Sequence, residues 1–125
     1  MDLEVHLKEL RVIKGYTASS ILSAAGEALA RDTTSASPNV DEALVAMLCN
    51  DVFGLSHECV ERLDPSDECI EVDIITRDEV LILVCSGKAA KSHIHCACHL
   101  TRDGNVALAR MMIDKLLKTV APLLG

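Results

Sequence analysis

The N-terminal stretch from Leu3 to Asp32 constrains the fold more than any other part of the sequence. It opens with leucines at helical spacing, at Leu3, Leu7 and Leu10. Gly15 follows where the end of a helix needs a left-handed residue. Segment 16–24 is rich in Ser, Thr and Ile, and segment 28–33 resumes after a turn at Gly26, a pattern that predicts a β-hairpin. A helix that leads directly into a hairpin predicts a fold that mixes helices and strands.

A long helix is predicted from Val40 to about Leu63, with Asn39 as its N-terminal cap. Two apolar lines run along it, formed by Leu44, Leu48, Val52, Leu55 and Cys59 and by Val45, Cys49, Phe53 and Val60. A surface helix of a globular protein usually buries a single apolar stripe. This helix carries more apolar surface than one layer of core requires, so the sequence predicts that it makes a second contact.

The C-terminal half predicts three strands and a final helix. The strands are expected at 69–76, 80–85 and 93–101, and the helix from about 106 to 122. In the first of these strands, three apolar residues alternate with two acidic ones, in the order Ile70, Glu71, Val72, Asp73 and Ile74. The sequence therefore predicts an α/β (α+β) chain, with one domain over residues 1–125.

Composition narrows the functional classes. Half of the residues are hydrophobic but only Tyr16 and Phe53 are aromatic, so the core must be aliphatic. The formal charge of -7 disfavours nucleic acid as a partner, because phosphate binding needs clustered Lys and Arg. No apolar run approaches the roughly 20 residues of a membrane span, and the N-terminus lacks the pattern of a signal peptide. We therefore expect a cytoplasmic protein without a membrane span.

Six cysteines raise the question of disulfide bonds. Four of them are spread singly through apolar segments, at Cys49, Cys59, Cys69 and Cys85. A free cysteine in such a segment behaves as a small hydrophobic residue. Cys96 and Cys98 lie two residues apart on one predicted strand, about 6.5–7 Å, which is too far for an unstrained disulfide. We expect reduced thiols, and a redox-catalytic role is disfavoured.

The segment from His93 to His99 is rich in histidine and cysteine, the residue types that bind zinc. Strand alternation gives it two faces, one with His93, His95 and His99 and the other with Ile94, Cys96, Cys98 and Leu100. Two histidines on one strand can reach a zinc ion, but the alternation separates them from the thiols. A fourth ligand would have to come from elsewhere, such as Glu71, Asp73 or His57. Core cysteines with histidines at a wet or interfacial face are therefore favoured over a metal site, and no cofactor is expected.

No arrangement of residues indicates catalysis, so no catalytic residue is predicted. Six cysteines and five histidines make chance pairs easy, and no signature of a nucleophile surrounds any of them. Basic residues gather in the last helix, where Arg110, Asp114 and Lys118 fall four residues apart. This spacing predicts an exposed face with internal ion pairs, and a partner-docking face is the alternative.

The first segment also carries a family resemblance. The matching residues are Leu7, Lys8, Glu9, Leu10, Ile13 and Gly15 before the first strand, and Gly26, Ala28, Leu29 and Ala30 at and after the turn. Through these residues and the order of its elements, the chain resembles the roadblock/dynein light-chain family. The resemblance implies a five-stranded antiparallel sheet, with one long helix on one face and the two terminal helices on the other.

The resemblance further implies a dimer, in which the long helix and the strand after it join two copies into one continuous sheet. Members of the family act as adaptors, as dynein light chains, or as regulators of small Ras-like GTPases, including bacterial ones. The surplus apolar surface of residues 40–63 agrees with this, since an exposed apolar patch usually marks an interface. The residues expected at the dimer interface are Leu44, Met47, Leu48, Phe53, Leu55, Ile70, Val72 and Ile74.

The leading hypothesis is a non-enzymatic, homodimeric adaptor or regulatory module that binds a small Ras-like GTPase or another protein. The alternative is a metal- or redox-responsive protein that uses the strand from His93 to His99. A small-molecule sensor ranks last, because the chain offers few aromatic residues and no obvious polar anchor for a ligand.

Overall fold

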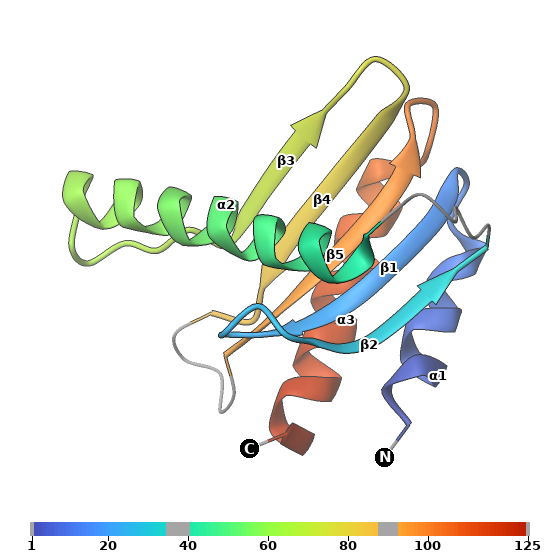
Figure 1. The fold of residues 1–125 in the computed structure, drawn as a ribbon, viewed down its shortest axis with the longest axis horizontal. Coiled ribbons are helices and arrows are strands. Elements are labelled where there is room, and N and C mark those ends of the chain that lie inside the picture. The colour runs from blue at the N-terminus through green and yellow to red at the C-terminus, as the bar shows by residue number, and fades with distance from the viewer. Residues whose placement is uncertain (1, 35–40, 88–92, 125) are drawn as a thin grey trace.

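A five-stranded antiparallel sheet in the order β2-β1-β5-β4-β3 forms the centre of the molecule (Figure 1). The structure is a computed structural model that describes residues 2–34, 41–87 and 93–124. The strands are β1 (Tyr16–Ser23), β2 (Ala28–Thr33), β3 (Glu71–Ile75), β4 (Glu79–Cys85) and β5 (Ile94–Thr101). The helices are α1 (Leu3–Lys8), the short 3-10 helix η1 (Glu9–Val12), α2 (Glu42–Leu63) and α3 (Val106–Leu124). The sheet and the order of elements confirm the predicted fold class.

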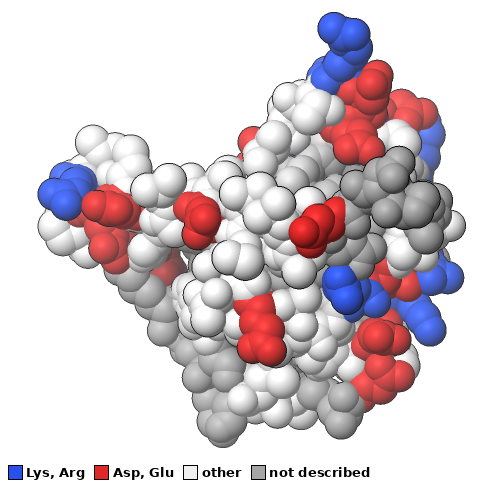
Figure 2. Space-filling view, viewed as in Figure 1, with Lys and Arg blue, Asp and Glu red and all other residues white. Residues whose placement is uncertain are grey.

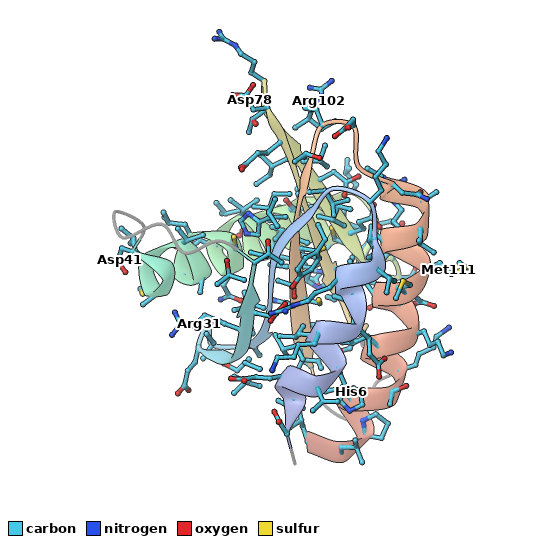
Figure 3. The ribbon with its side chains drawn as sticks, turned by 90° about the vertical axis from the view of Figure 1, so that its right-hand side faces the viewer. His6, Arg31, Asp41, Asp78, Arg102 and Met111 are labelled. Atoms are coloured by element: carbon cyan, nitrogen blue, oxygen red, sulfur yellow. The ribbon has the colours of Figure 1, made fainter. Side chains whose placement is uncertain are left out.

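Helices cover both faces of the sheet (Figure 3). The hydrophobic core on one face is larger than the core on the other. The larger core lies between the sheet and the layer of α1, η1 and α3. Its largest fully buried side chains are Leu7, Leu10, Ile21, Ile82, Cys96, Cys98, Leu100, Ile113 and Val120. The smaller core lies under α2 and contains Leu22, Ala46, Cys49, Phe53, Leu83, Cys85 and Ala97. The core is aliphatic apart from Phe53, as the composition predicted.

Gly15 turns the chain from the N-terminal helical segment into β1. It has φ 87°, in the left-handed region that the sequence pattern predicted. A Cβ atom here would lie 2.6 Å from Oγ1 of Thr101 and 2.7 Å from Cα of Gly104. Glycine is therefore required both by the backbone conformation and by the close approach of the chain that follows β5.

The start of α2 corrects the predicted cap. The helix begins at Glu42, and the side chain of Asp41 accepts a hydrogen bond from the backbone N–H of Leu44 at 3.1 Å. Asn39, which the sequence pattern indicated as the cap, lies outside the described residues together with Val40. Asp at the N-cap satisfies an amide that has no partner within the helix and places a negative charge at the positive end of the helix dipole.

The two faces of β5 are as predicted from strand alternation. Cys96 and Cys98 are fully buried in the larger core, on the side of α3. His95 faces the opposite way and lies under α2. The predicted separation of thiols from imidazoles on this strand is thus confirmed, and β5 begins at Ile94 rather than at His93.

A candidate protein-interaction surface

The outward side of α2 carries an exposed apolar surface. It is formed by Leu44, Met47, Leu48 and Leu55, which are 49%, 57%, 52% and 68% exposed. We call these four residues the outer α2 patch. The face of the molecule that carries α2 is mainly uncharged (Figure 2). Soluble proteins rarely group large exposed apolar side chains in this way unless the group meets a partner.

The inward side of α2 rests on the sheet. Among the described residues of this helix, Ala46, Cys49 and Phe53 are the buried ones, and their spacing of three and four follows one helical line. A helix of 22 residues is about 33 Å long. In Figure 1 its C-terminal part extends past the strands, so the sheet supports only part of its length. Much of the apolar surface of α2 therefore stays uncovered.

The length and composition of α2 correct the expectation that no apolar segment approaches the length of a membrane span. The segment Ala43–Leu63 is long and apolar enough to cross a membrane, although only 17% of its most apolar stretch is buried in the protein. It also carries four charged residues, Asp51, Glu58, Glu61 and Arg62. Those charges and the packing of its inward side on the sheet favour a helix that belongs to the folded domain.

Strand β3, which contacts α2, forms one edge of the sheet. It pairs with β4 on one side, and no described strand pairs with its other side. Val72 and Ile74 are half-buried against the smaller core under α2. Ile70, just before the strand, is 58% exposed. An open strand edge offers unpaired backbone groups to another strand.

The eight residues predicted at the dimer interface lie in three environments. Five are exposed: Leu44, Met47, Leu48, Leu55 and Ile70. Val72 and Ile74 are half-buried beneath α2. Phe53 is only 3% exposed, because it falls on the inward line of the helix. Phe53 therefore supports the surface from beneath instead of lying on it.

His95 is buried under the middle of α2, so the expectation of a wet or interfacial face is wrong for this histidine. It is 6% exposed, and its ring stacks on Phe53 with the ring centroids 4.6 Å apart. Its Nε2 atom lies 3.1 Å from Nε2 of His93, so one imidazole donates to the other. Burial lowers the pKa of His95 to about 4, and the nearby His93 and His57 act in the same direction. His95 is therefore neutral at physiological pH.

The three histidines considered as metal ligands do not meet at one point. His93 and His95 are in contact, but His99 lies four residues beyond His95, about 13 Å along an extended strand. Within residues 2–34, 41–87 and 93–124, no group of three His, Cys, Asp or Glu side chains is placed to hold a metal ion. The geometry therefore gives the metal hypothesis one pair of ligands and no complete site.

All six cysteines are free thiols. Burial raises the pKa of five of them, at Cys49, Cys69, Cys85, Cys96 and Cys98. The thiolate is the nucleophilic form, so a raised pKa keeps these side chains unreactive at neutral pH. Cys59 is exposed on α2. The four buried thiols, Cys49, Cys85, Cys96 and Cys98, thus behave as the small hydrophobic residues that the sequence predicted.

A cavity of about 400 Å³ opens beside the N-terminal half of α2, a feature that the sequence did not indicate. Its lining includes small residues from three elements, Ala18, Ser20, Ala46 and Ala97. Arg31, Glu79 and His99 also line it, and burial lowers the pKa of His99 while the carboxylate of Glu79 opposes this shift. The volume falls in the range of small-ligand pockets.

Arg110 makes contacts that its sequence spacing did not predict. Its Nε lies 2.6 Å from Oε2 of Glu71, and its Nη2 lies 2.5 Å from Oδ2 of Asp73. Asp114 instead pairs with Lys118 at 2.9 Å. The prediction of an ion pair inside α3 was thus right for Lys118 and wrong for Arg110, because α3 crosses the sheet next to the acidic side of β3.

Comparisons with known proteins identify the fold. No protein-family model matches the chain, and no curated protein matches it in sequence. Among solved structures, a Roadblock/LC7 domain from Streptomyces avermitilis has a TM-score of 0.83 at 19% identity, covering 99% of this chain and 98% of that one. This likeness extends over essentially the whole of both chains.

Two further structures share the fold at lower identity. MglB with a tetrameric arrangement has a TM-score of 0.81 at 12% identity, over 96% of this chain and 85% of that one. MglC from Myxococcus xanthus has a TM-score of 0.67 at 14% identity, over 98% of both chains. The resemblance found in the sequence is thus confirmed at the level of the fold, which is that of roadblock domains.

Proposed function

We propose that this chain is a non-enzymatic, cytoplasmic adaptor that forms a homodimer and regulates a small Ras-like GTPase. The observation that carries the proposal is the outer α2 patch. Leu44, Met47, Leu48 and Leu55 are exposed together on a helix whose inward side is already packed. Burying each of these side chains against a partner would contribute on the order of 1–2 kcal/mol, since each is already about half covered.

The open edge of β3 supports self-association. A second copy that adds its own β3 would extend the sheet, and a two-fold axis would make the same patch serve both copies. The two α2 helices would then lie on the same face of the joined sheet. MglB, which shares this fold, has been solved with a tetrameric arrangement.

The proposed regulation of a GTPase rests on the resemblance to roadblock domains and not on a particular residue. The sequence resembles roadblock domains, and the fold is shared with MglB and MglC. The raised pKa of the buried thiols argues against a nucleophilic cysteine. The module would therefore act by ordering the switch loops of its partner and not by supplying a reacting group.

A nucleotide-dependent pull-down tests this function. The full chain is immobilised and exposed to lysate of its source organism, once with GDP and once with a non-hydrolysable GTP analogue. We expect recovery of a small GTPase that favours one nucleotide, and a change in its rate of GTP hydrolysis when the two purified proteins are mixed. Met111→Asp is the control, because Met111 is 65% exposed on α3, on the opposite face.

The outcomes separate the proposal from nonspecific capture. A GTPase that binds the wild-type protein and Met111→Asp, but not Leu48→Asp, supports a GTPase site that depends on the dimer formed through the outer α2 patch. Absence of any GTPase with either nucleotide contradicts the proposed regulation. Bound metal in protein purified without a histidine tag would instead favour the alternative that uses His93 and His95.

A further inference from the structure

The side of β3 that faces α3 carries a charge cluster at the edge of the sheet. Glu71 and Asp73 point to the same side of the strand, opposite to Val72 and Ile74. The guanidinium of Arg110 bridges the two carboxylates, at 2.6 Å from Glu71 and 2.5 Å from Asp73. The carboxylate side chains are 25% and 23% exposed, so this cluster is partly withdrawn from water.

The charges of this cluster do not cancel within one chain. Two carboxylates meet one guanidinium, and Oδ1 of Asp73 is buried with no hydrogen-bond partner among the described residues. Burial raises the pKa of Glu71, the guanidinium of Arg110 opposes this, and the neighbouring Asp73 adds to the rise. A residual negative charge is thus held at a strand edge.

Pairing of β3 with a second copy would concentrate this charge. In an antiparallel pair, directly opposed side chains lie about 4.5–5.5 Å apart, and like charges there are destabilising. Because a two-fold axis contributes the same residues from both copies, four carboxylates would line one side of the pair. Two Arg110 side chains would be the cations already in contact with them. Without these cations, the pairing would bring together four uncompensated carboxylates.

The other edge of the sheet does not offer the same arrangement. Strand β2 is the opposite edge, and it lies in contact with α1 (Figure 1). Strand β3 instead follows the exposed Ile70 and has its apolar side under α2. The edge at β3 therefore combines contact with α2 and an exposed apolar residue.

We propose that Arg110 controls self-association, by neutralising Glu71 and Asp73 so that β3 can pair with β3 of a second copy. The proposal rests on the homodimer proposed above and adds the residue that permits it. Acidic side chains on an edge strand ordinarily prevent pairing with other chains. Arg110 removes that protection by pairing with both carboxylates of its own chain, so β3 of each copy is left free to pair.

Removal of the charges by neutral substitutions tests this role. Arg110→Gln should raise the dimer dissociation constant by roughly tenfold or more, as measured by sedimentation equilibrium. Adding Glu71→Gln and Asp73→Asn in the same chain should restore the constant to about the wild-type value, because no carboxylate is then left to neutralise. Lys118→Gln is the matched control, since it removes one cation from α3 at a site that pairs with Asp114.

A merely structural role for Arg110 predicts a different result. If Arg110 only fastened α3 to β3, the triple variant would lack the same ion pairs and would associate as weakly as Arg110→Gln. Circular dichroism on each variant shows whether α3 remains folded. An Arg110→Gln variant that dimerises like the wild type, or a triple variant that is not rescued, would overturn the inference alone. A wild-type protein that stays monomeric at every concentration would overturn the homodimer and the inference together.

Discussion

His95 shows how the fold sets the chemistry of a single side chain. Sequence alternation predicted its face, but not that its ring would stack on Phe53 or that burial would lower its pKa to about 4. Its Nδ1 has no hydrogen-bond partner among the described residues. An imidazole held in this way is stable under α2 only while it is neutral.

Acid should therefore loosen the packing under α2. The pKa of His95 is lowered by folding, so the unfolded chain takes up the proton first, near pH 6.5. The contribution of His95 is fully present above that pH and is lost as the pH falls toward about 4, by up to about 1.4 kcal/mol per pH unit. We expect His95→Phe to flatten the dependence of the free energy of unfolding on pH in this window, measured by urea denaturation. Equal slopes for both proteins would contradict the assignment.

Asp32 is a second buried polar residue that the sequence did not single out. Arg11 donates to its two oxygens at 2.5 and 2.9 Å, and Tyr16 donates to Oδ2 at 2.7 Å. The hydrogen bonds from Arg11 lower the pKa of Asp32, burial opposes this, and the bond from Tyr16 lowers it further. These contacts join η1, β1 and β2.

Asp32→Asn should weaken the N-terminal third of the fold. We expect a loss of about 1–2 kcal/mol in the free energy of unfolding at pH 7, at the low end because half-exposed Arg11 is screened by solvent. Since the folded pKa of Asp32 is depressed, its contribution is present above the unfolded pKa near 4 and is lost as the pH falls below it. The variant and the wild type should therefore converge in urea denaturation at acid pH. A constant difference down to pH 2 would contradict this.

At the scale of elements, the sequence predicted the strands and helices but not all their contacts. Apolar periodicity and turn residues place each element to within a few residues, because burial repeats every two or 3.6 positions. The same periodicity cannot show which long-range partner a charged residue meets. Arg110 reaches Glu71 and Asp73 because α3 crosses the sheet, which spacing within α3 does not reveal.

For the residues predicted at the dimer interface, too, periodicity does not reveal the long-range contacts. Leu44, Leu48 and Phe53 all lie on apolar lines of α2, but only Phe53 falls on the line that the sheet covers. Which line faces inward depends on how the helix lies across β1, β4 and β5. The cavity lined by Arg31 and His99 also depends on that crossing, so no local pattern signalled it.

Leu48→Asp tests the outer α2 patch as an element. Because Leu48 is 52% exposed, a charge there should leave the fold intact and lower self-association, by roughly tenfold or more in the dissociation constant. Far-ultraviolet circular dichroism and sedimentation velocity measure the two effects separately. Met111→Asp on α3 is the control and should change neither. A Leu48→Asp protein that remains a normal dimer would remove Leu48 from the interface.

At the scale of the whole molecule, the two faces of the sheet are covered to different extents. The layer of α1, η1 and α3 closes the larger core, whereas the face of α2 and the edge of β3 leave apolar surface and backbone groups uncovered. In the proposed homodimer, one symmetric contact would cover both the face of α2 and the edge of β3.

The mass of the wild-type protein in solution tests this account most directly. Sedimentation equilibrium of the full chain at neutral pH should give twice the chain mass of 13.5 kDa, and the mass should fall toward 13.5 kDa on dilution. That result would show that the uncovered surface is filled by a second copy. A mass of 13.5 kDa at every concentration at which the protein stays soluble would contradict the account.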